Sequence, residues 1–243
     1  MVVKAGKRDI VNEAFRVLRT NFEFTIGTHP EQNVIIFTSL NPGSGKSHLA
    51  ANMAMSLAIK KKKVLLIDGD LRHGSTSMLV GNPGEGLSDY LNGRIADIHD
   101  ILHKGEESGL VKYFDIIPIG TIPPNPTELL FTPLLEQMIR QMRQEYDYVF
   151  IDCPPIEVVA DTPIYEQFAD RTIFVVRSGL MERSMLPEID ALYKEKKFKN
   201  MTMILNGTKT RGGRYGSHYG YGYGYGYGYG YNYNKEKNGG AKS

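Results

Sequence analysis

The stretch FTSLNPGSGKSHLAANMA, residues 37–54, follows an apolar run and opens a helical pattern. Gly43 and Gly45 let the backbone turn its N–H groups toward an anion, at a helix N-terminus that already favours negative charge. Lys46 would then reach the β- and γ-phosphates of a nucleotide, and the Ser47 hydroxyl would bind Mg²⁺. The strict form of this loop begins with glycine, where this chain has leucine. Its place between a strand and a helix still favours a nucleotide-binding loop over a chance match.

Two further apolar runs end in carboxylates. KVLLIDGDLR (63–72) carries Asp68 and Asp70, and DYVFIDCPP (147–155) carries Asp152. Acidic residues at the carboxyl ends of neighbouring parallel strands point at the crevice where such sheets bind ligands. Three carboxylates beside a phosphate loop can hold Mg²⁺, directly or through water, and leave one to take a proton. Each aspartate alone could merely cap the next helix, but all three together with the loop favour a catalytic site.

Short β-branched runs alternate with longer amphipathic stretches along the chain. The runs are almost continuously apolar, which is typical of strands buried on both faces of a parallel sheet. The pattern predicts an α/β fold with a doubly wound, mainly parallel sheet flanked by helices, as in P-loop NTPases. The predicted strands are 33–38, 63–68, 114–119, 147–152, 171–176 and 201–206. The predicted helices are about 9–26, 47–60, 127–145, 161–169 and 184–197.

Bulk composition narrows the class of protein. The chain has 243 residues, of which 41% are hydrophobic, and residues 1–206 are enough for one domain with one core. A formal net charge of +2 gives no argument for nucleic acid as a partner. The single cysteine, Cys153, excludes a disulfide framework and fits a reducing cytoplasm. No apolar run approaches the roughly 18 residues of a membrane span. We therefore expect a soluble chain that reaches a membrane only through a partner or a segment absent from this sequence.

The periodicity ends at Gly207, after which Gly, Tyr, Asn and Lys dominate. With almost no aliphatic residues to bury, residues 207–243 are predicted to be a disordered tail. A flexible chain of this length has a root-mean-square span of roughly 35 Å and could enter the site of a neighbouring subunit. The alternative is a self-associating strand, in which every ring of YGYGYGYGYGYGY (219–231) would fall on one face.

With these motifs the chain resembles the bacterial tyrosine kinases (BY-kinases) of capsule and exopolysaccharide systems, whose cytoplasmic domains are similar to MinD/ParA-like P-loop ATPases. The resemblance rests on SLNPGSGKS as Walker A, VLLIDGDLR as Walker A′ and VFIDCPP as Walker B. PPNPTELL (123–130), EAFRVLRTN (13–21) and the terminal tyrosines also match the family pattern. The MinD/ParA relatives carry an additional lysine early in Walker A. Residues 40–44 contain none, which favours the kinase branch.

The resemblance implies ATP as phosphoryl donor, Mg²⁺ as cofactor and tyrosine as acceptor, in an autokinase that acts in trans. It implies that the nucleotide is bound by Gly43, Ser44, Gly45, Lys46, Ser47, His48 and Asn206. It implies Mg²⁺ ligation by Ser47, Asp70 and Asp152, and catalytic roles for Lys46, Asp68 and Asp70. Asp68 is the expected base for the phenol proton, but the division between Asp68 and Asp70 rests on family analogy. Asn206 is either an adenine contact or a turn-forming residue. The expected acceptors are Tyr215, Tyr219, Tyr221, Tyr223, Tyr225, Tyr227, Tyr229, Tyr231 and Tyr233.

The stretch 13–21 also carries an assembly motif, in which Glu13, Arg16 and Arg19 are spaced by three residues. On a helix this spacing puts Glu13 and Arg16 on one face with Arg19 at its edge, which on its own would suggest a solvated surface. The resemblance instead implies subunit contacts in a ring, an octamer, when the tail is unphosphorylated. It also implies a transmembrane polysaccharide co-polymerase or activator segment and a protein-tyrosine phosphatase as partners, at the inner face of the cell membrane. The competing hypothesis is a MinD/ParA-type positioning ATPase.

Overall fold

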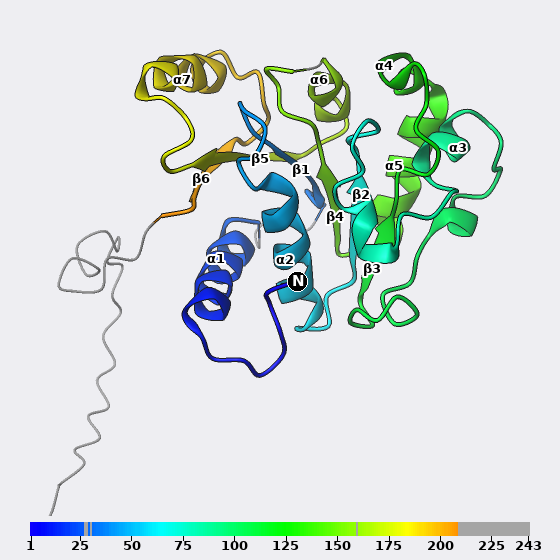
Figure 1. Ribbon diagram of the computed structural model, residues 1–243, viewed down its shortest axis with the longest axis horizontal. Helices are drawn as coiled ribbons and strands as arrows, with labels where there is room; N and C mark the ends of the chain where they lie inside the picture. The colour runs from blue at the N-terminus through cyan, green and yellow to red at the C-terminus, as the bar shows by residue number, and fades with distance from the viewer. Residues whose placement is uncertain (27–28, 30, 159, 209–243) are drawn as a thin grey trace, which may run out of the picture. The chain divides into compact units, whose positions relative to one another are not determined.

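A parallel sheet of six strands forms the centre of the fold (Figure 1). The computed structural model describes residues 1–26, 29, 31–158 and 160–208, and residues 1–208 form one compact unit. The predicted tail tyrosines lie outside the described residues. The strands are β1 (Val34–Thr38), β2 (Val64–Asp68), β3 (Phe114–Ile117), β4 (Tyr148–Asp152), β5 (Arg171–Arg177) and β6 (Thr202–Asn206). Their order is β3-β2-β4-β1-β5-β6, which confirms the predicted α/β class with a doubly wound parallel sheet.

Helices cover both faces of this sheet (Figure 1). They are α1 (Ile10–Ile26), α2 (Lys46–Ala58), α3 (Leu87–Leu91), α4 (Pro126–Leu129), α5 (Pro133–Glu145), α6 (Asp161–Glu166) and α7 (Leu186–Lys194). Short 3-10 turns lie at Ser77–Val80, Ile98–Ile101 and Arg183–Met185. Along β1, Ile35 and Phe37 pack on the side of α1 and α2, while Val34 and Ile36 pack on the side of α3 and α5. The continuous apolar runs therefore become strands because alternate side chains are buried in two different layers.

Several element boundaries differ from the prediction for local reasons. The predicted helix 127–145 is two helices, α4 and α5, because Pro133 lacks an N–H and begins a new first turn. The predicted helix 184–197 contains a 3-10 turn before α7 begins at Leu186. The predicted helix 161–169 ends at Glu166. The structure adds α3 within residues 69–113, where the sequence pattern had predicted no helix.

The start of α1 is fixed by a side-chain cap. The Asp9 carboxylate accepts a hydrogen bond from the backbone N–H of Asn12 at 2.9 Å, which satisfies a donor of the first turn. The Asn12 side chain in turn accepts from the Lys4 N–H at 2.9 Å. The Asn52 side chain on α2 accepts from the N–H groups of Val2 and Val3. The first residues of the chain are thus tied to both helices.

This cap predicts a loss of order in α1 at acid pH. The bonds from the side chain and the backbone of Asn12, with a smaller contribution from Lys7, lower the pKa of Asp9 from 3.8 to about 2. Because the folded pKa is depressed, the cap stabilises α1 above the ordinary pKa and is lost as pH falls through the folded value. We expect the protection of the Asn12 amide, which is its exchange rate relative to that of an unstructured peptide at the same pH, to fall between about pH 4 and pH 2, followed by NMR. An Asp9→Asn variant, which keeps a capping oxygen without titrating, should show no such step; an identical step in that variant would contradict the assignment.

Candidate functional site

The loop between β1 and α2 has the backbone conformation that the sequence predicted. Gly43 has φ +74° and Gly45 has φ +88°, both in the left-handed region that favours glycine. Gly45 caps α2, and Lys46 is its first residue. Leu40, which replaces the expected first glycine of the loop, is buried and packs with Phe174 and the inner side of α7. The departure from the strict motif is therefore a packing contact and leaves the turn at Gly43 and Gly45 intact.

Side chains from the far half of the sheet brace this loop. Arg177, at the end of β5, donates to the carbonyl oxygen of Gly43 at 2.8 Å. Asn206, at the end of β6, donates through its amide nitrogen to the carbonyl oxygen of Ser44 at 3.0 Å. A Cβ atom on Gly45 would lie 2.4 Å from that same amide nitrogen. With its carbonyls held from β5 and β6, the loop keeps its N–H groups available for an anion.

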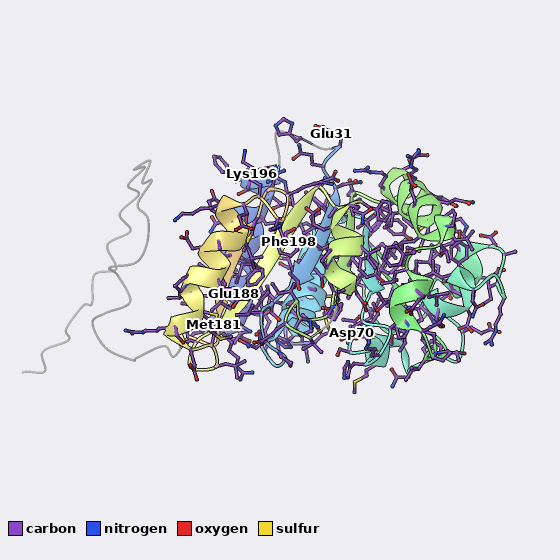
Figure 2. All side chains as sticks on the ribbon, turned by 90° about the horizontal axis from the view of Figure 1, so that it is seen from above. Glu31, Asp70, Met181, Glu188, Lys196 and Phe198 are labelled. Atoms are coloured by element: carbon purple, nitrogen blue, oxygen red, sulfur yellow. The ribbon has the colours of Figure 1, made fainter. Side chains whose placement is uncertain are left out.

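The predicted carboxylates gather at the same end of the sheet. Asp68 and Asp152 are direct neighbours in the register of β2 and β4, and both are fully buried. The Lys46 ammonium lies 3.5 Å from Asp152 Oδ1 and 3.2 Å from the Ser47 hydroxyl. Figure 2 shows Asp70 at the end of the molecule opposite Glu31, which precedes β1. The structure therefore brings together the loop and all three aspartates, as the strand ends predicted.

Asp68 is held on one side only. Its Oδ2 accepts hydrogen bonds from the N–H of Thr76 at 2.9 Å and from the N–H and hydroxyl of Ser77, each at 2.7 Å. Its Oδ1 has no hydrogen-bond partner among the described residues, although it is buried. Burial raises the pKa of Asp68 because it disfavours the charged form, and the bonds from Ser77 and Thr76 oppose that rise. One oxygen is thus fixed and the other remains available to a proton or a cation.

Asp152 is in a similar position. Burial raises the pKa of Asp152 to about 7, the Lys46 charge opposes this, and the neighbouring charge of Asp68 adds to it. Its Oδ2 is also buried without a partner in the part of the chain that the structure describes. Two orphaned carboxylate oxygens beside a lysine and a serine hydroxyl fit a divalent cation. No group of three or more His, Cys, Asp or Glu side chains in the described ranges could hold a metal alone. Buried carboxylates beside a phosphate loop fit Mg²⁺, which uses one or two carboxylates together with phosphate oxygens.

A cleft of about 520 Å³ opens over these groups. Its wall includes the glycines of the loop, with Lys46, Ser47 and His48, and on the other side Asp70 and Arg72. Burial lowers the pKa of His48, which favours its neutral form. A larger depression, of about 690 Å³, lies at the amino ends of the strands, but its lining contains no glycine-rich turn. The 520 Å³ cleft is therefore the candidate site, and Asp70 is the carboxylate that lines it.

Comparison with known proteins shows which family has this combination of a phosphate loop and three strand-end aspartates. A family model described as an AAA domain matches residues 32–178. The tyrosine-protein kinase YwqD of Bacillus subtilis is 34% identical over 90% of this chain and 91% of its own length. The chain belongs to the bacterial tyrosine-protein kinases.

A solved kinase of this family has the same fold. The kinase domain of the Escherichia coli tyrosine kinase ETK matches with a TM-score of 0.73 at 32% identity, covering 88% of this chain and 80% of that one. A MinD protein of Pyrococcus horikoshii complexed with Mg-ADP matches with a TM-score of 0.58 at 23% identity over 71% of this chain and 69% of that one, a likeness of fold alone.

Some relatives in the family are much longer than this chain. The tyrosine-protein kinase Wzc of Salmonella typhimurium is 39% identical over 70% of this chain, a match that covers 23% of Wzc. The chain spans about a quarter of the length of the first curated relatives that it matches. Within the described residues, no helix combines the length and the apolar character needed to cross a bilayer.

Glu13, Arg16 and Arg19, the residues of the expected assembly motif, lie on α1. Arg16 pairs with Glu13 at 2.7 Å on the exposed side of the helix. Arg19 turns toward α2, where it donates to the Ser56 carbonyl oxygen at 2.8 Å, and its side chain is only 12% exposed. The predicted arrangement on the helix is thus present, with Arg19 at the edge of the face. Its role in subunit contact stays a prediction.

Two residues that support the site through contacts between distant parts of the chain were not predicted from the sequence. Arg177 lies one residue beyond the predicted strand 171–176, and Asp161 was predicted only as the start of the helix 161–169. The one available signal was a charged side chain directly bordering an apolar run. Neither position reveals its partner, because Gly43 and Arg72 lie more than 80 residues away in the sequence.

The contact of Asn206 with the Ser44 carbonyl oxygen predicts a test that separates a brace of the loop from the expected adenine contact. As a brace of the loop, Asn206 should contribute equally to the binding of any nucleoside triphosphate. An Asn206→Ala variant should lose roughly three- to tenfold in affinity for ATP and for GTP alike, the effect of one hydrogen bond. Fluorescence titration with both nucleotides measures this. A loss confined to ATP would support the adenine contact instead.

Proposed function

We propose that this chain is an ATP- and Mg²⁺-dependent protein-tyrosine autokinase that phosphorylates its own C-terminal tyrosines in trans. Through that reaction it regulates the polymerisation and export of capsular or exopolysaccharide. The observation that carries the proposal is the braced phosphate loop facing three strand-end aspartates in a chain that ends in repeated tyrosines. Relatives of similar length bear the name of tyrosine-protein kinases, which supports transfer to tyrosine over simple ATP hydrolysis.

In this proposal each residue has a defined task. Lys46 and the backbone of residues 43–47 bind the nucleotide phosphates, and Ser47, Asp70 and Asp152 would hold Mg²⁺. The cation, when bound, neutralises charge on the phosphates. The phenol oxygen forms a bond to the γ-phosphorus, the bond from that phosphorus to the bridging oxygen breaks, and ADP leaves. The phenol proton passes to Asp68, whose raised pKa makes it a stronger base than an ordinary carboxylate.

The reaction predicts mass changes that distinguish it from a positioning ATPase. Incubation of the full chain with Mg-ATP should add successive phosphates to the intact mass. In a mixture, a Lys46→Met chain that carries the tail should be modified by an active chain of residues 1–208. The Lys46→Met chain alone is the control and should keep its mass. ADP release with unchanged protein mass would instead indicate the MinD/ParA-type activity, and an unmodified Lys46→Met chain in the mixture would refute transfer in trans.

Asp68 can be separated from Asp70 by paired variants. Asp68→Asn should lower phosphate transfer by at least about 100-fold, the usual effect of removing a general base, while ADP still binds. Asp70→Asn, at the wall of the cleft, should weaken Mg²⁺-dependent ADP binding. Quench-flow kinetics and ADP titrations measure the two effects. An Asp68→Asn enzyme with full activity would show that the base is another group.

We also propose a ring-shaped homo-oligomer, an octamer, of the unphosphorylated chain, which would hold each tail near a neighbouring site. Each phosphate carries about −1.5 to −2 charges, so that nine tail phosphates would add roughly −13 to −18 and drive the subunits apart. Further proposed partners are a transmembrane polysaccharide co-polymerase or activator segment at the inner membrane face and a protein-tyrosine phosphatase. The net charge of +2 gives no support for nucleic acid.

If the chain forms this ring, its mass in solution should depend on the two arginines of α1 and on phosphorylation of the tail. Arg16→Ala combined with Arg19→Ala should give a monomer without phosphate and slow autophosphorylation. Arg140→Ala is the matched control, because Arg140 is also a helical arginine paired with a glutamate, here on the exposed side of α5. Light scattering measures both variants and the wild type. A wild-type mass that is the same with and without phosphate would rule out dissociation by phosphorylation.

A further inference from the structure

Two side chains of helix α6 bind the loop that carries Asp70, one just before that residue and one just after it. Tyr165 donates through its hydroxyl to the carbonyl oxygen of Gly69 at 3.2 Å, just before Asp70. Asp161 pairs with the guanidinium of Arg72, just after Asp70. Asp161 and Tyr165 are four residues apart and share one face of α6. Both side chains are fully buried.

Thr127 closes this arrangement from a third segment. Its hydroxyl accepts from Arg72 Nη2 at 2.9 Å and donates to Asp161 Oδ1 at 2.7 Å. Arg72, Thr127 and Asp161 therefore form a closed ring of hydrogen bonds between the loop, the start of α4 and the start of α6. Since a buried carboxylate is costly unless it is paired, Asp161 strongly favours the position of Arg72 in which the pair is made.

The loop has little room to move on its other side. Gly69 donates through its N–H to the carbonyl oxygen of Asp152 at 2.9 Å. A Cβ atom at Gly69 would lie 3.0 Å from that oxygen and 3.2 Å from the Tyr165 ring. The loop is therefore packed between the end of β4 and α6, with Asp70 between the two fixed points.

Arg72 lines the cleft and could be read as a direct phosphate ligand. Its geometry favours a different role, because both terminal nitrogens already donate to Asp161 and Thr127. The buried carboxylate also balances its charge.

We infer that Tyr165, Asp161 and Thr127 are positioning residues, which act through Gly69 and Arg72 to hold Asp70 where a metal-bound nucleotide needs it. The inference rests on the proposed function only in taking Asp70 as a ligand of Mg²⁺. Because Mg²⁺ demands near-ideal octahedral geometry, a small displacement of Asp70 lowers metal affinity. None of the three residues touches the nucleotide in this role.

The test removes one hydroxyl group at a time and leaves the side-chain volume nearly unchanged. ADP affinity is measured by calorimetry with Mg²⁺ and with EDTA, and thermal unfolding is followed by circular dichroism. Tyr165→Phe should weaken Mg-ADP binding roughly three- to tenfold, the effect of one hydrogen bond, and Thr127→Val, which removes two, should weaken it by at least as much. Each should change ADP binding in EDTA less than about twofold. Thr127→Ser, which keeps the hydroxyl, should restore Mg-ADP binding.

Tyr146→Phe is the matched control. It removes another buried tyrosine hydroxyl, which donates to Asp115 Oδ2 at 2.8 Å and lies outside the lining of the cleft. This variant should lower the unfolding temperature without changing the ratio of affinities with and without Mg²⁺. If Tyr165→Phe and Thr127→Val behave like Tyr146→Phe, their role is structural and the inference is wrong.

The same titrations separate the inference from the proposed kinase function. A wild-type chain that binds Mg-ADP but transfers no phosphate would refute the kinase, while the pattern among the variants would still support the positioning role. A wild-type chain whose ADP affinity is the same in Mg²⁺ and in EDTA would overturn the inference.

Discussion

Two aspartates, Asp68 and Asp152, end neighbouring parallel strands in register and are fully buried. Two neighbouring carboxylates repel each other when both are ionised, and burial adds to the free-energy cost of their charges. The Lys46 ammonium, at the first turn of α2, offsets part of that cost by its contact with Asp152. One oxygen of each aspartate still has no partner among the described residues. The strand register, the start of α2 and the phosphate loop all converge on this pair, which is therefore prepared for a further cation.

Both halves of the sheet contribute to the surroundings of the pair. From one side, Arg177 and Asn206 at the ends of β5 and β6 hold the carbonyls of the phosphate loop. From the other, α6 and α4 hold the loop that carries Asp70. The strand order changes direction around β1, so the loop that follows β1 is reached from both sides. The site is rigid because each loop is fixed by side chains of elements that follow much later in the sequence.

The sequence allowed the sheet, the loop and the three aspartates to be predicted, because each depends on a local pattern. Continuous apolar runs specify buried parallel strands, and Gly43, Gly45 and Lys46 specify an anion-binding turn. The contacts of Arg177, Asp161 and Tyr165 could not be predicted, since they depend on which elements meet in three dimensions. Pro133 is a sequence signal for the break before α5, but the helical pattern on both sides of it favoured one continuous helix. Leu40 could be understood only once its packing against Phe174 was known.

The central claim is that Asp152, with Ser47 and Asp70, holds Mg²⁺ on a bound nucleotide beside Asp68, and thermal unfolding in ADP with and without Mg²⁺ tests it most directly. A ligand present at about 100 times its dissociation constant stabilises the folded state by about 2.7 kcal/mol. The wild type should therefore unfold at a higher temperature in Mg-ADP than in ADP alone. Asp152→Asn should lose that additional increase, while Asp115→Asn, which alters a buried aspartate outside the cleft, should keep it. An equal Mg²⁺-dependent increase in the wild type and in Asp152→Asn would contradict the account.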